Sequence, residues 1–140
     1  MIRGDAPVVR SAVLAIDDDP LVLDLVRLYL WDYEVVTASS GRAALSLLSV
    51  ACPPLILLDV RMPAMDGLET LVSIRRGLGL TKARVMMLTA AADRPTIAKA
   101  IERGADGYLL KPFSRRSLVG RIVRLPKWTD APSPGQPLRI

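Results

Sequence analysis

The chain of 140 residues contains no histidine and only one cysteine, Cys52. Without histidine it cannot use Ser-His-Asp or Cys-His catalysis, ligate a metal through imidazole, or carry a phosphohistidine. One cysteine cannot form an intramolecular disulfide or a multi-cysteine zinc site. No apolar run approaches the roughly 18 residues of a membrane helix, because Asp24 and Arg27 interrupt the most apolar stretch, 21–31. The N-terminal residues also lack the apolar segment of a secretory signal. We therefore expect a soluble, cytoplasmic protein.

Hydrophobic residues make up 51% of the chain, which is enough to build the core of one domain. The net charge of +5 is unevenly distributed. Residues 1–113 contain 13 basic and 13 acidic residues, whereas residues 114–140 contain six basic residues and one acidic residue. This basic end is interpreted either as a solvated helix face followed by a tail or as a surface that attracts an anionic partner.

Short β-rich runs alternate with amphipathic runs, which predicts five strands and five helices. The strands are expected near residues 13–16, 33–37, 55–58, 84–88 and 107–110. The helices are expected to begin after Asp19, Ser40, Asp66, Asp93 or Arg94, and Ser114. This alternation favours an open, mostly parallel α/β sheet with helices on both faces. It predicts one domain over residues 11–125 and a flexible, proline-rich tail over residues 126–140.

Two of the predicted helices have informative apolar patterns. The helix from Pro20 to about Trp31 has too many apolar residues for one face to bury, so some are either scattered on the surface or form a partner or dimer surface. The helix after Pro95 carries Ile97, Ala100, Ile101 and Gly104 at the spacing i, i+3, i+4, i+7, which places them on one face of the helix.

Chemically active side chains follow four of the five predicted strands. Asp17 and Asp18 follow the first strand, Asp59 the third, Thr89 the fourth and Lys111 the fifth. Parallel α/β sheets bind ligands outside the carboxyl ends of their strands, so these groups are expected to converge there. Each has a structural alternative as a solvated loop acid, a strand-end threonine or a surface lysine. The adjacent Asp19, directly before Pro20, is interpreted as a helix cap.

Carboxylates without histidine or cysteine favour a hard cation, Mg²⁺ or Mn²⁺, over zinc or copper. A hard cation, a lysine, a hydroxyl and a carboxylate nucleophile together suit phosphoryl transfer. Nucleotide use is not supported, because the sequence has neither a GxxxxGK[ST] nor a GxGxxG phosphate loop.

The sequence resembles the receiver domain of two-component response regulators. The matching segments are residues 16–20 (IDDDP), 58–67 (LDVRMPAMDG), 88–90 (LTA) and 104–113 (GADGYLLKPF). The resemblance extends over about residues 11–125. It implies a flavodoxin-like sheet with strand order 2-1-3-4-5.

The resemblance also implies a role for each matching residue. Asp59 is the expected phosphoacceptor for a histidine kinase or a histidine phosphotransfer protein. Asp17, Asp18, Asp59 and the backbone carbonyl of Arg61 are the expected Mg²⁺ ligands.

Further implied roles concern signalling. Thr89 is the expected switch hydroxyl that moves to a phosphoryl oxygen, and Lys111 is the expected ion-pair partner of that oxygen. The Lys111–Pro112 peptide is expected to be cis, and Tyr108 is the expected switch aromatic. Phosphorylation would then shift the fourth helix, fifth strand and fifth helix, which bind a downstream protein or a second copy. Such a protein is not an enzyme acting on an external substrate, because it catalyses only its own phosphorylation and dephosphorylation.

Two positions depart from the family pattern. Arg61 places a long cation two residues after the phosphoacceptor, and Ala91 offers no polar group two residues after Thr89. In this family these positions tune the phosphoryl lifetime, so the pair predicts a long-lived phosphoryl group.

The sequence leaves three alternatives open. The first is a degenerate receiver that serves only as a protein-interaction or dimerisation module, although the complete set of five site residues argues against it. The second is nucleic-acid binding through the basic end, but the 27 residues after Phe113 leave no room for a helix-turn-helix domain, so nucleic acid is not expected. The third is a receiver cut from a longer chain.

Overall fold

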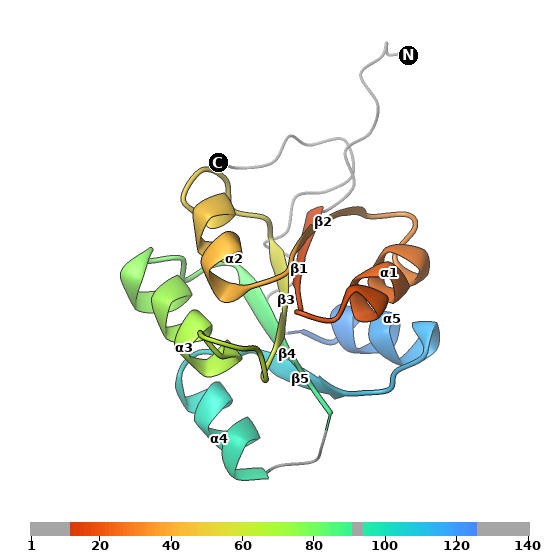
Figure 1. The fold of residues 1–140 in the computed structure, drawn as a ribbon. Helices are drawn as coiled ribbons and strands as arrows, with labels where there is room; N and C mark the ends of the chain where they lie inside the picture. The colour runs from red at the N-terminus through yellow and green to blue at the C-terminus, as the bar shows by residue number, and fades with distance from the viewer. Residues whose placement is uncertain (1–11, 91–93, 126–140) are drawn as a thin grey trace.

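A computed structural model describes residues 12–90 and 94–125 (Figure 1). The strands are β1 (Ala12–Ile16), β2 (Glu34–Ala38), β3 (Leu55–Asp59), β4 (Arg84–Thr89) and β5 (Gly107–Leu110). The helices are α1 (Pro20–Tyr29), α2 (Gly41–Leu48), α3 (Gly67–Val72), its π-helical continuation η1 (Ser73–Gly77), α4 (Arg94–Glu102) and α5 (Arg115–Val123). All strand pairs are parallel and the order is β2-β1-β3-β4-β5, which confirms the predicted sheet.

The helices cover both faces of the sheet, with α1 and α5 on one side and α2, α3 and α4 on the other (Figure 1). Side chains alternate between these faces along each strand. On β1, Val13 and Ala15 join the core beneath α1 and α5, whereas Leu14 and Ile16 join the core beneath α2, α3 and α4. Burial on both faces explains why the central strand β3 is a continuous apolar run that ends at Asp59.

Side-chain caps start the helices where the sequence predicts them. Asp19 accepts a hydrogen bond from the Leu21 backbone N–H at 2.9 Å, with Pro20 in the first helical position. Ser40 and Ser114 cap α2 and α5 in the same way. These caps determine where each helix leaves the carboxyl end of the preceding strand and therefore shape the loops that surround the site.

Two details of the helices differ from the sequence prediction. The first helix ends at Tyr29 rather than near Trp31, because the buried Leu30 leaves the helical conformation and begins the turn into β2. On α4, Ala100 is buried but Ile101 is 47% exposed, so the predicted apolar face is only partly covered by the core. The physical reason is that the helix turns by about 100° per residue, which directs Ile101 away when Ala100 faces the sheet.

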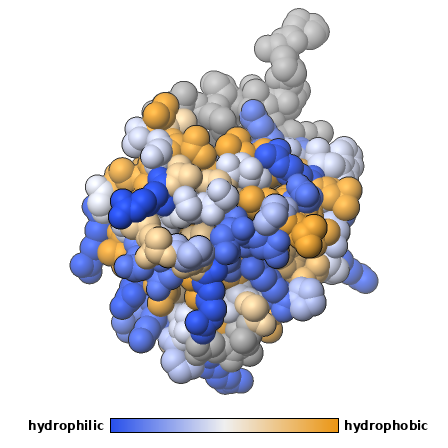
Figure 2. Space-filling view, in the orientation of Figure 1, coloured by the Kyte–Doolittle hydropathy of each residue, from blue (hydrophilic) through white to orange (hydrophobic). Residues whose placement is uncertain are grey.

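The apolar character of α1 is only partly used in the core. Leu23, Val26 and Leu30 are buried, which leaves several large apolar side chains in solvent. The exposed ones are Leu21, Leu25, Leu28 and, just after the helix, Trp31. They contribute to the hydrophobic surface that Figure 2 shows where α1 lies in Figure 1. None of the helices in the described part of the chain has the length and hydrophobicity that a membrane-spanning helix requires.

Candidate functional site

The carboxylates predicted from the strand ends lie together. Ile16 pairs with Leu58, so the next residues along β1 and β3, Asp17 and Asp59, end neighbouring strands. One carboxylate oxygen from each of Asp17, Asp18 and Asp59 lies within 4.8 Å of the others. Asp17 is 1% exposed and Asp59 is 4% exposed, whereas Asp18 is open to solvent. The fold therefore places two buried acids and one exposed acid around a single point.

Lys111 joins this cluster from the loop after β5. Its Nζ lies 2.7 Å from Asp17 Oδ2 and 3.0 Å from Asp59 Oδ1. The Lys111 backbone N–H donates to the Thr89 carbonyl at 2.7 Å, and the following peptide bond to Pro112 is cis, as the resemblance implies. Four strand ends of the sheet thus contribute to one site.

The electrostatics of the site favour a charged lysine and a readily protonated Asp59. Burial raises the pKa of Asp59 to about 6, with Lys111 opposing the rise and Asp17 adding to it. Burial alone would lower the pKa of Lys111, but its hydrogen bonds and attraction to Asp17 and Asp59 outweigh burial and raise it. One lysine therefore faces three carboxylates, and negative charge remains in excess.

A divalent cation would balance the excess negative charge of these carboxylates. The three acids supply carboxylate oxygens, the hard ligands that Mg²⁺ prefers, and Asp18 is accessible from solvent. Arg61, two residues after the end of β3, is exposed. The donor set of Asp17, Asp18 and Asp59 suits Mg²⁺ or Mn²⁺.

Thr89 is buried at the end of β4, the strand next to Asp59. Gly67, at the start of α3, lies against the end of β3: its N–H donates to the Val60 carbonyl at 2.8 Å, and an added Cβ would collide with the Asp59 carbonyl oxygen. Only glycine allows this close approach of α3 to the end of β3. The other position singled out beside Thr89, Ala91, lies outside the described residues.

Tyr108 is half-buried on β5 and packs against the core beneath α4. The Arg121 guanidinium carbon of α5 lies 5.1 Å from the centre of its ring. This distance is within the range of a cation–π interaction. The structure thus brings the predicted switch tyrosine into contact with a residue that the sequence analysis did not single out.

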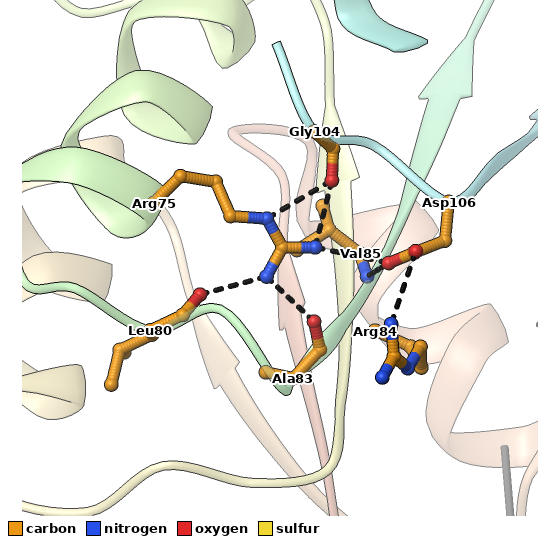
Figure 3. Close-up of polar contacts among 7 residues, drawn as sticks. All are labelled: Arg75, Leu80, Ala83, Arg84, Val85, Gly104 and Asp106. Carbon is orange, nitrogen blue, oxygen red and sulfur yellow. Dashed lines mark hydrogen bonds and ion pairs between the residues drawn. The ribbon is translucent and has the colours of Figure 1, made fainter. Parts of the chain in front are cut away.

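A second polar cluster lies at the opposite end of β4 and was missed by the sequence analysis (Figure 3). Arg75 donates to the carbonyls of Leu80, Ala83 and Gly104 and forms a 3.0 Å ion pair with Asp106. Asp106 also accepts from the Val85 N–H at 2.9 Å and pairs with Arg84 at 3.3 Å. This cluster, termed the Arg75 cluster, ties η1 and the loops before β4 and β5 to the sheet.

Comparison with known proteins identifies the family. The profile described as "Response regulator receiver domain" matches residues 13–123. The chain belongs to this family. The receiver domain is 32% identical over 127 residues to the DNA-binding response regulator MtrA of Mycolicibacterium smegmatis, covering 89% of this chain and 54% of that protein. It is 36% identical over 114 residues to the transcriptional regulatory protein KdpE of Mycobacterium tuberculosis, covering 80% and 49%.

A solved structure agrees with this assignment. The receiver domain superposes on the chemotaxis protein CheY4 of Vibrio cholerae with a TM-score of 0.78 and 33% identity, covering 83% of this chain and 98% of that one. It spans about half the length of the curated relatives it matches. The expectation that nucleic acid is not a partner finds no support, because the MtrA relative is named a DNA-binding regulator.

Proposed function

We propose that this receiver domain accepts a phosphoryl group on Asp59 from the phosphohistidine of a histidine kinase or histidine phosphotransfer protein. The observation that carries the proposal is the buried Asp17–Lys111–Asp59 arrangement, with contacts of 2.7 and 3.0 Å. An Asp59 carboxylate oxygen forms a bond to phosphorus while the phosphorus–nitrogen bond of the donor breaks. The electron pair of that bond leaves with the imidazole, and Asp59 becomes an acyl phosphate.

The residues around Asp59 support this reaction in different ways. Asp17, Asp18, Asp59 and the Arg61 carbonyl would hold Mg²⁺ or Mn²⁺, which would neutralise charge on the phosphoryl oxygens. Lys111 supplies a fixed positive charge beside the accepting carboxylate, and burial excludes water from it. Thr89 offers a hydroxyl to a phosphoryl oxygen. The protein accepts the phosphoryl group on its own Asp59 and converts no external substrate.

Signalling follows from the position of the switch residues. Thr89 ends β4, Tyr108 lies on the neighbouring β5, and Arg121 connects Tyr108 to α5. Phosphorylation favours an inward Thr89 and Tyr108, which changes the α4–β5–α5 surface that a downstream protein or a second copy contacts. We place this cycle in the cytoplasm, within a domain over residues 11–125. The predicted tail, 126–140, lies outside the described residues.

Intact mass spectrometry after incubation with acetyl phosphate and Mg²⁺ tests phosphoacceptance. We expect the parent protein to gain one phosphoryl group and Asp59→Ala to gain none, because the variant lacks the carboxylate that accepts the group. Asp24→Ala, which removes an exposed acid of α1, is the matched control and should gain the group as the parent does. Equal phosphorylation of Asp59→Ala contradicts the proposal. If the parent gains nothing from acetyl phosphate or from a phosphorylated histidine kinase, the interaction-module alternative is favoured instead.

The exposed Arg61 predicts slow loss of the phosphoryl group, because a long cation beside Asp59 hinders the hydrolytic water. We expect Arg61→Asn to release phosphate several-fold faster than the parent, with little change in the rate of phosphorylation. The measurement is the decay of phosphorylated protein after the donor is removed, followed by intact mass. Unchanged decay kinetics in Arg61→Asn would show that Arg61 does not set the lifetime.

A further inference from the structure

The exposed charges of the receiver domain are divided unevenly between two parts of its surface. Over residues 94–125 the exposed basic residues are Arg94, Lys99, Arg103, Arg115, Arg116, Arg121 and Arg124, and the only exposed acid is Glu102. Over residues 12–90 the exposed charges balance, with five basic residues (Arg27, Arg42, Arg61, Arg76, Lys82) and five acidic ones (Asp18, Asp19, Asp24, Glu34, Glu69). We call the exposed surface of residues 94–125 the basic face.

The remaining charged groups of this segment do not reduce the excess. Asp106 is largely buried and pairs with Arg75 and Arg84. Lys111 points into the candidate site, where it contacts Asp17 and Asp59. Within residues 94–125, Glu102 is therefore the only acid that faces solvent beside seven exposed cations. An anionic partner would gain from this field, and a second copy docked through the same face would meet charge of the same sign.

The basic face also exposes apolar side chains, which distinguishes a polypeptide from a nucleic acid as its partner. Ile101 on α4, Leu110 on β5 and Val123 on α5 are all exposed. Six of the seven exposed cations are arginines, the charged residue enriched in protein interfaces. The phosphates of a nucleic acid would pair with the arginines but would offer no apolar surface to cover the exposed aliphatic side chains. Acidic residues interspersed with apolar ones match both features.

We propose that the basic face binds an acidic, amphipathic polypeptide segment of a partner protein. Carboxylates of this segment pair with arginines such as Arg121 and Arg124, and its apolar residues cover side chains such as Ile101 and Leu110. Identifying this partner as the downstream target rests on the proposed function. The binding itself requires only the charge and apolar surface of α4, β5 and α5, which lie together along the β5 edge of the sheet (Figure 1).

The test is an NMR titration of isotope-labelled protein with a synthetic helical peptide that carries leucine on one face and glutamate on the other. We expect chemical-shift changes confined to α4, β5 and α5, with affinity that weakens as salt is added. The double charge reversal Arg121→Glu with Arg124→Glu should weaken binding tenfold or more. Arg42→Glu with Lys82→Glu, which reverses two exposed cations outside the basic face, should change it less than twofold.

Further measurements distinguish peptide binding from phosphoacceptance, nucleic-acid binding and dimerisation. Asp59→Ala should bind the peptide as the parent does, so failure of phosphoacceptance leaves this proposal standing and failure of peptide binding leaves phosphoacceptance standing. Shift changes mapped elsewhere, or equal loss of binding in both double variants, overturn the proposal. Tighter binding of a DNA duplex than of the peptide at the same salt concentration assigns the face to nucleic acid instead. Dimerisation through these helices in sedimentation measurements also contradicts it.

Discussion

Arg75→Ala is expected to lower the free energy of unfolding by about 3–5 kcal/mol. The Arg75 guanidinium satisfies three backbone carbonyls and the carboxylate of Asp106, all in a partly buried position. Alanine would leave these acceptors without their donors and Asp106 with one cation, Arg84, in place of two. Unsatisfied buried acceptors and a broken buried ion pair are both strongly destabilising. Urea denaturation followed by circular dichroism measures the effect.

The neighbouring Arg76 provides the matched control. It lies on the same π-helical segment but is exposed, so Arg76→Ala should change the free energy of unfolding by no more than about 0.5 kcal/mol. Similar stabilities for Arg75→Ala and Arg76→Ala would contradict the structural role of the Arg75 cluster. Because the cluster anchors the loop before β5, its loss should also loosen the strand that carries Tyr108.

Asp59→Asn is expected to stabilise the metal-free protein at neutral pH. Asp59 has a pKa of about 6 in the folded protein against an ordinary value of 3.8, so the folded state binds its proton more tightly than the unfolded state. Ionisation of Asp59 therefore opposes folding, and this effect grows as the pH rises from about 4 to about 6 and is complete above that. Asparagine cannot ionise and should stabilise the fold at pH 7 by on the order of 2–3 kcal/mol.

The pH dependence distinguishes this effect from a simple change in packing. The advantage of Asp59→Asn in a chelator-containing buffer should shrink to about half by pH 5, because the parent then keeps much of its Asp59 protonated. Saturating Mg²⁺ should stabilise the parent more than the variant, since the variant lacks one carboxylate ligand. Asp24→Asn, at an exposed site, should show neither effect. Destabilisation by Asp59→Asn at neutral pH without metal would contradict the account.

Much of the site could be predicted from the sequence because its residues follow buried strands directly. The apolar run 55–58 places Asp59 at a strand end, and the equivalent position of Asp17 after β1 follows from parallel pairing. Lys111 follows β5 in the same way. Local patterns thus determined where these groups lie, and the parallel sheet determined that they meet. The cap at Asp19 was likewise predictable, because it involves residues two apart.

The features that could not be predicted depend on contacts between distant residues. Arg75 donates a hydrogen bond to the backbone carbonyl of Gly104, 29 residues away. Every residue has such a carbonyl, so no residue type in the sequence indicates this contact. The placement of Arg121 over Tyr108 depends on how α5 packs against β5. The exposure of Ile101 could not be predicted, because periodicity alone does not distinguish it from the buried Ala100 next to it. Sequence periodicity defines a helix face only to within about one residue, and packing decides the rest.

Chemical mapping of the modified residue tests most directly whether Asp59 carries the phosphoryl group. Protein phosphorylated by acetyl phosphate and Mg²⁺ would be reduced with borohydride, which converts an aspartyl phosphate to homoserine, and then digested for peptide sequencing by mass spectrometry. We expect homoserine at position 59 in the parent and at no position in Asp59→Ala. Homoserine at position 17 or 18 with an unmodified Asp59 would contradict this expectation.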